Sequence, residues 1–444
     1  MGAPADAGDA SIWRLRASFF LFGTINNVLY VIILSAALDL VPQGTPKGII
    51  AFCNIAPALL AKFGWPYLLK GRVRYTRRII ACTAISVLGM AVVAIYESLN
   101  MRLMGIALAS LSSGLGELTF LQLSTTYREV AAREAIGYFS SGTGGAGLLG
   151  AALWWVLRSL GVREGVGISA VLPFALPASY FLLLPSPAAY QYLEDDAPEA
   201  AAYAPIPSGP GLDSSVTFSG SLRQRTTALS AADKWQLVKP LIGRFMVPLF
   251  AVYTFEYTIN QGISPTLLFP VPDAQEHRIL HLIIKSLRDY YPFWQLVYQS
   301  FVFLSRSSIS LGVPPLARRL LPVPAMLQGC ILTFLALESA YGILPEAPNV
   351  AIPAVAFFIA VEGLCGGLAY VTAFYRVGQE AREASESNTT KTPERLAQER
   401  EFQMGSIGLA DSFGILLASL LAVPTEVSLC KAQVARGREL CRAV

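Results

Sequence analysis

Apolar residues follow one another in long stretches along this chain, and polar residues gather in the connections between them. Most stretches are about twenty residues long, which is the length that a helix needs to cross a lipid bilayer. Continuous stretches of this kind favour helices over the alternating strands of a membrane barrel, which are only about ten residues long. The predicted spans cover residues 17–40, 48–69, 79–96, 103–125, 136–160, 166–184, 241–262, 292–312, 323–344, 350–375 and 403–423.

These spans predict an all-α polytopic membrane protein with about eleven transmembrane helices, grouped as six and then five. The residues between the two groups are rich in Pro, Ala, Ser and Gly and cannot bury enough apolar surface to fold alone, so they are expected to form a disordered cytoplasmic linker. Two further polar segments stand out: a charged, helix-prone loop at 377–400, and the run 279–287, which is consistent with an amphipathic interfacial helix. The predicted segments are a cytoplasmic N-terminus at 1–16, a first half at 17–184, the linker at 185–240, a second half at 241–423 and a C-terminal tail at 424–444.

Composition agrees with a membrane protein and argues against a soluble one. Hydrophobic residues make up 54% of the chain and charged residues only 14%, whereas an average soluble domain carries about 25% charged residues. The mean hydropathy is +0.50. The net charge of +4 indicates no nucleic-acid partner. The partner that composition identifies is therefore the lipid bilayer, and it says nothing of protein partners.

Metal and enzyme chemistry find little support in the sequence. There are only two histidines and no CxxC pair, so no metal site is expected. The segment 142–147 matches the pattern GxGxxG, but no strand precedes it and it lies in a membrane span, so close helix packing explains it better than a dinucleotide. Since no nucleophile has a plausible base beside it, we expect neither a cofactor nor an enzyme.

The distribution of Lys and Arg predicts the orientation of the chain. Basic residues gather in alternate connections, most densely in the tight loop at 70–78, and cytoplasmic loops carry such an excess. The N-terminus is therefore predicted to be cytoplasmic, and an odd number of spans places the tail in the lumen. The tail is nevertheless basic, and Cys441 stands four residues from the end, as in a prenylation box with an unusual arginine. A prenylated tail would require an even number of spans, so the side of the tail and the modification of Cys441 stay open.

The two groups of spans share short sequences. Each match pairs one span with the sixth span after it and keeps the same direction, which is the layout of major-facilitator-type transporters. Chance similarity between apolar helices is the alternative. The matching pairs are TINN at 24–27 with TINQ at 258–261, GLLGAAL at 147–153 with GILLASL at 414–420, and YR at 127–128 with YR at 375–376.

Ionisable residues inside the spans are the first candidates for function, because each is costly in lipid unless it lies in a cavity or beside a partner. Those in or at the ends of the spans are Lys62, Glu117, Arg244, Glu256, Arg306, Glu362 and Asp411. Lys62 and Arg244 can instead extend toward the membrane surface near helix ends, and Arg306 can simply anchor the cytoplasmic end of its span. The three glutamates lie deeper, where a carboxyl group can exchange protons near neutral pH or can simply bond to a neighbouring helix.

Together with nearby polar residues these side chains predict a binding site at the middle of the membrane. Glu256 and Asn260 share one helix face, because they are four residues apart. In a major-facilitator layout their helix faces the first span, so this pair is expected to meet Asn26 and Asn27 across a central cavity. The candidates for binding a solute or a proton are Asn26, Asn27, Tyr30, Glu117, Glu256, Asn260, Gln261, Tyr298, Arg306 and Glu362.

Several longer motifs resemble those of the battenin family, the Batten-disease protein family with its fungal vacuolar members. The similarity extends from about residue 20 to 430 and leaves out the linker and the loop before the last span. The chain departs from the animal members in its linker and lacks their clear prenylation box. The motifs are NNVLYV at 26–31, SSGLGE at 112–117, SSGTGGAG at 140–147, FEYTINQG at 255–262, SRSS at 305–308, EGL at 362–364 and REF at 400–402.

This resemblance implies a multi-pass protein of the vacuolar or lysosomal membrane. It further implies a role in vacuolar pH homeostasis and in vacuolar transport, including that of basic amino acids. The leading hypothesis is an alternating-access carrier for a small polar solute, coupled to protons. A scaffold that does not transport, but organises trafficking partners through its linker, is the main alternative, and an intramembrane enzyme is a weaker one.

Overall fold

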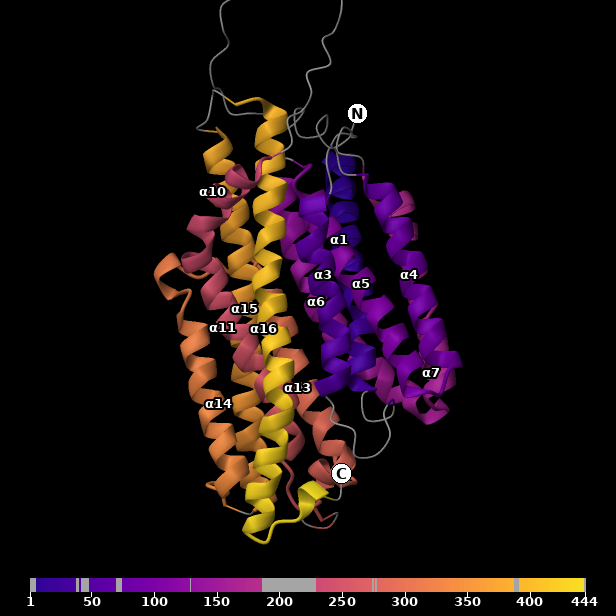
Figure 1. Ribbon diagram of the computed structural model, residues 1–444, viewed down its shortest axis with the longest axis vertical. Helices are drawn as coiled ribbons and strands as arrows, with labels where there is room; N and C mark the ends of the chain where they lie inside the picture. The colour runs from indigo at the N-terminus through magenta and orange to yellow at the C-terminus, as the bar shows by residue number, and fades with distance from the viewer. Residues whose placement is uncertain are drawn as a thin grey trace, which may run out of the picture.

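The computed structural model describes residues 5–36, 40, 48–68, 74–127, 129–185, 229–273, 275, 278–345, 347–386 and 391–442. Helices dominate this part of the chain, because a backbone in lipid must satisfy its hydrogen bonds within its own segment. Most of the predicted linker lies outside the described residues. In Figure 1 the indigo-to-magenta helices of the first part stand beside the orange-to-yellow helices of the second, all running roughly along the long axis.

The first bundle contains five long helices and one broken span. The broken span begins with α7 (Val162–Ser169) and continues through α8 (Ala175–Ala178) and the turn η3 (Ser179–Leu183). Pro173 and Pro177 lie in it, and each removes a backbone N–H donor, which explains the interruptions. The long helices are α1 (Ala5–Ser35), α3 (Gly48–Leu68), α4 (Tyr75–Ile95), α5 (Leu99–Ser124) and α6 (Glu129–Leu157).

The second bundle opens with a span built from several joined pieces. α10 (Ala231–Leu241) and α11 (Val247–Thr258) are separated by a wider turn, η4 (Ile242–Met246), and a second such turn, η5 (Ile259–Ile263), follows α11. Prolines at 240 and 248 flank the first turn, and they free carbonyl groups that a widened turn accommodates. The remaining long helices are α13 (Tyr290–Arg306), α14 (Val323–Tyr341), α15 (Pro348–Glu386) and α16 (Pro393–Ala435).

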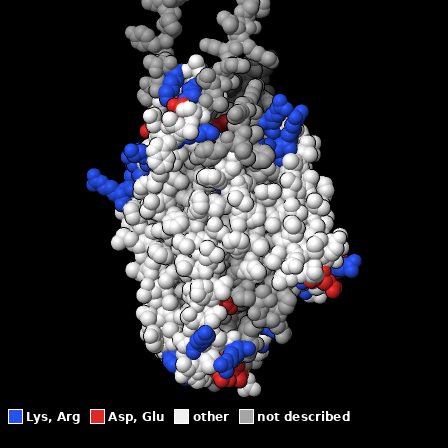
Figure 2. Space-filling view, in the orientation of Figure 1, with Lys and Arg blue, Asp and Glu red and all other residues white. Residues whose placement is uncertain are grey.

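The molecule has the charge distribution of a membrane-spanning protein. By length and hydropathy, eight described helices can cross a bilayer. α13, with 17 residues, is slightly shorter. In Figure 2 the middle of the visible face carries almost no charged residue, and Lys and Arg gather toward the two ends of the bundle. A broad uncharged belt of this kind matches the hydrocarbon core of a bilayer.

The packing of the helices repeats between the bundles. α1 packs on α6 as α11 packs on α16, and α3 packs on α5 as α13 packs on α15. The bundles meet through two equivalent contacts, α3 with α16 and α6 with α13. Each contact therefore joins the second helix of one bundle to the fifth helix of the other. This arrangement confirms the predicted pseudo-repeat of a six-helix and a five-helix half.

Small residues on α6 explain two of these contacts. A Cβ atom added at Gly142 would collide with the carbonyl oxygen of Phe20 on α1. One added at Gly144 would lie 2.8 Å from the Cα atom of Phe303 on α13. The GxGxxG match therefore serves close approach of backbones, as helix pairs in membranes often require, and the predicted interpretation is confirmed.

Several predicted boundaries differ from the structure. The segment 377–400, predicted as a loop, is largely helical, because α15 and α16 both extend into it. α16 also continues through Pro424 to Ala435, well into the predicted tail. Within the run 279–287 the structure has a short helix, α12 (Arg278–Ile283), which is too short to cross a membrane.

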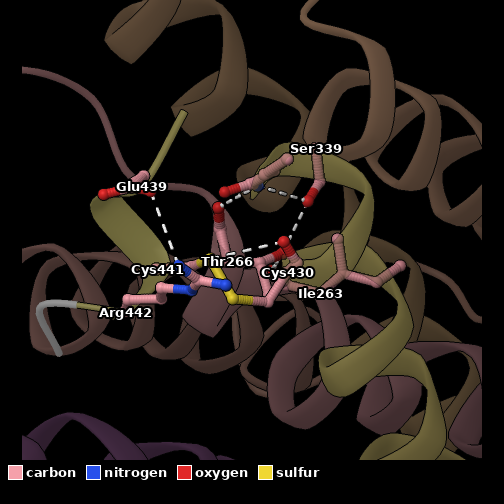
Figure 3. Close-up of a disulfide and its surroundings, with 8 residues drawn as sticks. Ile263, Thr266, Ser339, Cys430, Glu439, Cys441 and Arg442 are labelled. Carbon is pink, nitrogen blue, oxygen red and sulfur yellow. Dashed lines mark hydrogen bonds and ion pairs between the residues drawn. A yellow bond between two sulfur atoms is a disulfide. The ribbon is translucent and has the colours of Figure 1, made fainter. Parts of the chain in front are cut away.

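The tail folds back on the end of α16 through a disulfide. Cys430 and Cys441 are bonded, with their Cα atoms 5.7 Å apart (Figure 3). The last helical turns of α16 are held to neighbouring helices, since Gln433 Nε2 donates to the carbonyl oxygen of Thr266 at 2.8 Å and to Ser339 Oγ at 2.9 Å. The two chain ends lie at opposite ends of the bundle (Figure 1). In this pairing Cys441 has no free thiol for prenylation.

The disulfide leads to a first prediction about the tail. When the oxidised protein is denatured, a maleimide polymer should add to only four of its six cysteines, and to all six after reduction. The variants Cys430→Ser and Cys441→Ser should each expose the other cysteine and so add one label without reduction. Electrophoretic mobility measures the number of labels. Six labels on the unreduced wild type would contradict the pairing and return the prenylation of Cys441 to consideration.

Candidate functional site

A cavity of about 90 Å³ lies between the two halves. Its volume is enough for several water molecules. Residues from α1, α3, α5 and α6 form one part of its wall, and residues from α11, α13, α15 and α16 form the other. The ionisable residues that line it, tyrosines apart, are Lys62, Glu117, Arg306 and Asp411.

Lys62 is at the centre of a cluster that joins the two halves. Its Nζ lies 2.9 Å from Glu117 Oε2 and 3.5 Å from Asp411 Oδ1. It also donates a hydrogen bond of 2.9 Å to Ser412 Oγ. Lys62 is only 5% exposed, so the prediction that it extends to the membrane surface is wrong. The side chain is instead an internal cation that two carboxylates compensate.

Local sequence explains why Glu117 meets Lys62. Gly114 brings α5 so close to α3 that an added Cβ atom would lie 2.6 Å from the Cα atom of Ala58. Lys62 is one helical turn beyond Ala58, and Glu117 is nearly one turn beyond Gly114. The close approach therefore aligns a cation on one helix with a carboxylate on the next. A larger residue at 114 would separate them.

Arg306 lies on the opposite part of the wall with neutral partners. Its Nη1 donates to Thr143 Oγ1 at 2.7 Å, and its Nη2 donates to the Tyr253 hydroxyl at 2.8 Å. The guanidinium carbon is 4.3 Å from the centre of the Tyr370 ring, a cation–π distance. Within the described part of the chain no carboxylate pairs with Arg306. It lines the cavity, as expected of a candidate binding residue, and so does more than anchor the end of its span.

Glu256 belongs to a hydrogen-bond network inside the second half. Tyr298, which lines the cavity, donates its hydroxyl hydrogen to Glu256 Oε1. Gln328 on α14 donates to Glu256 Oε2 at 3.1 Å and to the carbonyl oxygen of Glu362 at 3.0 Å. Glu256 is 1% exposed. The network therefore connects a buried carboxyl group to the cavity through one tyrosine.

A second carboxyl group extends this network. Asn260 Nδ2 donates to Glu362 Oε1 at 2.8 Å, and Gln295 Nε2 donates to Asn260 Oδ1 at 3.0 Å. Glu362 Oε2 and both polar atoms of the Gln261 side chain have no hydrogen-bond partner among the described residues. Glu256 and Glu362 thus belong to one network, in which each amide bonds the carboxyl group of one glutamate and the backbone carbonyl of the other.

The expected meeting of the two polar pairs does not occur. α1 and α11 both border the cavity, as a major-facilitator layout predicts. However, Asn26 Nδ2 donates to the carbonyl oxygen of Ser113 within its own half, at 3.0 Å. Glu256 and Asn260 likewise bond within the second half. Backbone and amide groups near each pair satisfy it locally, so the pairs do not cross the cavity.

The ten predicted site residues thus divide into two groups. The structure places five on the cavity wall and five in the layer behind it. On the wall are Asn27, Tyr30, Glu117, Tyr298 and Arg306. Behind it are Asn26, Glu256, Asn260, Gln261 and Glu362.

Other residues of the site were not predicted from the sequence. Lys62 and Asp411 were recognised as ionisable but were not assigned to the site. Gln328 carries a signal that sequence could have used, an amide within an apolar span. Tyr253 and Tyr370 carry none, because tyrosine is common in membrane helices and only tertiary contacts reveal their place beside Arg306.

The arrangement can bind a polar solute and can hold protons. Arg306 offers hydrogen-bond donors, and the cluster around Lys62 offers carboxylates from both halves. Among the described residues no group of three or more His, Cys, Asp or Glu side chains could hold a metal ion.

Residues 17–432 match the family model described as CLN3 protein. Protein BTN1 of Mycosarcoma maydis is 45% identical to the chain, over 97% of this chain and 89% of its own. Protein BTN1 of Cryptococcus neoformans var. neoformans serotype D (strain B-3501A) is 43% identical, over 97% and 95%. Protein btn1 of Schizosaccharomyces pombe is 38% identical, over 96% and 97%.

Solved transporter structures share the fold. A mutant form of the nucleoside transporter NupG superposes with a TM-score of 0.52 at 11% identity, covering 97% of this chain and 98% of that one. The POT family transporter PepTSo superposes with a TM-score of 0.50 at 13% identity, covering 99% of both chains. Identities this low establish the architecture alone. The chain therefore has the fold of a multi-span, major-facilitator-like transporter.

Proposed function

Because the chain belongs to the CLN3 (battenin) family, we propose that it is an alternating-access carrier of the vacuolar membrane. It moves a small polar solute, such as a basic amino acid, and its transport is coupled to protons and so affects vacuolar pH. The observation that carries this proposal is the cavity between the halves, whose wall holds Lys62, Glu117, Arg306 and Asp411. A scaffold that does not transport would not require a cavity lined by charged side chains between its two halves.

Alternating access is supported by the way in which the halves are joined. They meet through two equivalent contacts, α3 with α16 and α6 with α13. Rocking of one half against the other at these contacts can open the cavity to either side in turn. The ion pair between Lys62 and Asp411 crosses one of these contacts. Its strength therefore depends on the relative position of the halves.

Proton coupling is supported by the buried carboxyl groups. Glu117 and Asp411 share one lysine, and only the pair with Asp411 joins the halves, so protonation of Asp411 weakens the link between them. Glu256 reaches the cavity through Tyr298. Protons can thus act on both the contact between the halves and the second-half network.

Transport by the purified protein tests the proposal. We expect proteoliposomes with an acidic interior to show flux of at least one of lysine, arginine and histidine, and this flux should fall when a protonophore removes the pH gradient. Empty liposomes are the control. Deleting residues 198–220 of the linker, which lie outside the described residues, should leave the flux intact. No flux for any solute, together with loss of the cellular phenotype on this deletion, would favour the scaffold.

A further inference from the structure

Arg306 holds a positive charge in the cavity, and the side chains in direct contact with it are neutral. Thr143 and Tyr253 accept its hydrogen bonds, and Tyr370 offers the face of its ring. Arg306 Nε has no hydrogen-bond partner among the described residues. Cations inside proteins are usually paired with an anion, because removing a charge from water is costly. Glu256 attracts this charge from behind the wall, but no described carboxylate contacts the guanidinium group.

The pseudo-repeat shows that Lys62 in the other half occupies a similar position and does have carboxylate partners. Lys62 is on the second helix of the first half and bonds to Ser412 on the fifth helix of the other half. Arg306 is on the second helix of the second half and bonds to Thr143 on the fifth helix of the first half. The two cations thus occupy corresponding places, but two carboxylates lie beside Lys62. Their absence beside Arg306 leaves one of two similar positions open for an anion.

We propose that the guanidinium group of Arg306 binds an anionic group, a carboxylate or a phosphate, of the transported solute, a proposal that rests on the proposed transport function. A planar guanidinium presents donors in a fixed fork that matches both groups. Tyr253 and Tyr370 hold this fork in place from two sides. Lys62 is unsuited to the role, because its own carboxylates already compensate it.

A second polar group on the wall, the side-chain oxygen of Asn54, also has no hydrogen-bond partner among the described residues. Asn54, which lines the cavity, is 1% exposed. Its Nδ2 donates to the carbonyl oxygen of Tyr30 at 3.3 Å, whereas its Oδ1 has no partner among the residues that the structure describes. A buried polar atom without a hydrogen bond is unfavourable. A solute that brings an anion to Arg306 and a donor to Asn54 would satisfy both parts of the wall.

Matched pairs of probes test the site in the wild-type protein. Binding to the purified full-length protein is measured by calorimetry for L-lysine against L-lysinamide, and for phosphoethanolamine against ethanolamine. Each pair differs only in its anionic group. We expect the anionic member of at least one pair to bind about tenfold more tightly, because the other member cannot form the charge-assisted hydrogen bond to Arg306. Which pair shows the preference distinguishes a carboxylate site from a phosphate site.

Variants then assign the preference to Arg306. Arg306→Gln should bind both members of the pair equally, and Arg306→Lys should keep part of the preference because it retains a point charge. Arg244→Gln is the matched control, since Arg244 is outside the cavity and pairs with Glu380. Equal binding of both members by the wild type, or a preference that survives in Arg306→Gln, would overturn the proposal. The wild-type comparison stands even when a variant fails to fold.

These outcomes separate the anion site from the transport function. A protein that carries lysinamide as fast as lysine across proteoliposomes would remain a carrier without this site. A protein that prefers the anionic probe but moves no solute would keep the site and lose the proposed function. Each result therefore bears on one of the two proposals.

Discussion

Replacing Lys62 by methionine is expected to lower the free energy of unfolding by about 3–5 kcal/mol, which is the usual cost of removing one partner from a buried ion pair. Glu117 and Asp411 would then face each other without a cation, and both side chains are largely buried. Methionine keeps most of the volume of lysine, so the change is chiefly one of charge. Thermal unfolding of the detergent-purified protein measures the loss.

Two further variants separate charge from packing. The combined variant Lys62→Met, Glu117→Gln should regain part of the stability, because it leaves one unpaired carboxylate in place of two. Lys391→Gln removes a lysine from a more exposed pair with Glu399, and it should unfold as the wild type does. If Lys62→Met alone unfolds like the wild type, water in the cavity compensates the carboxylates, and the cluster does not hold the halves together.

Glu256→Gln is expected to leave the protein folded and in the same membrane as the wild type but to reduce transport about tenfold or more. Glutamine can still accept the hydrogen bond from Tyr298, whereas its amide would present a second donor toward Gln328. A lost hydrogen bond to a charged group corresponds to roughly 1.5–3 kcal/mol. Because Tyr298 lies on the cavity wall, a change in its hydrogen bond to residue 256 alters the surface that the solute contacts. Flux into proteoliposomes and the amount of protein in the membrane of the wild-type protein are the two measurements.

A matched control exists on α14. Glu338 is also buried, but it accepts a hydrogen bond from the backbone N–H of Leu344, at 2.7 Å, and does not line the cavity. Glu338→Gln should therefore transport normally if it folds. The role of Glu256 is refuted if Glu256→Gln reaches the membrane of the wild-type protein in normal amount and fully restores a strain that lacks the protein. Retention of the variant in the secretory pathway would instead indicate a structural role.

Hydropathy and local spacing were enough to predict the architecture. Lipid offers the backbone no hydrogen bonds, so each long apolar stretch had to be a helix wherever it packs. Short matches such as TINN at 24–27 and TINQ at 258–261 predicted the repeat. In the structure the corresponding helices of the two halves make corresponding contacts. Ends of helices were less predictable. Hydropathy does not determine where a helix stops once its apolar stretch ends, and both α15 and α16 continue as helices beyond their predicted spans.

The sequence by itself determined which side chains have a high free-energy cost in a membrane. Only the tertiary structure decided what each one pairs with. A lysine near a predicted helix end can reach the surface or a partner, and the choice for Lys62 depended on Gly114, which brings Glu117 within reach. For Arg306 the sequence left open a binding role or a helix-end anchor, and the packing of α6, α11 and α15 placed Thr143, Tyr253 and Tyr370 around it. Glu256 found its partners on α13 and α14 and not on α1. The cost of placing a residue in lipid depends on its own segment and on the solvent. Pairing depends on distances between segments far apart in the chain, which hydropathy does not contain.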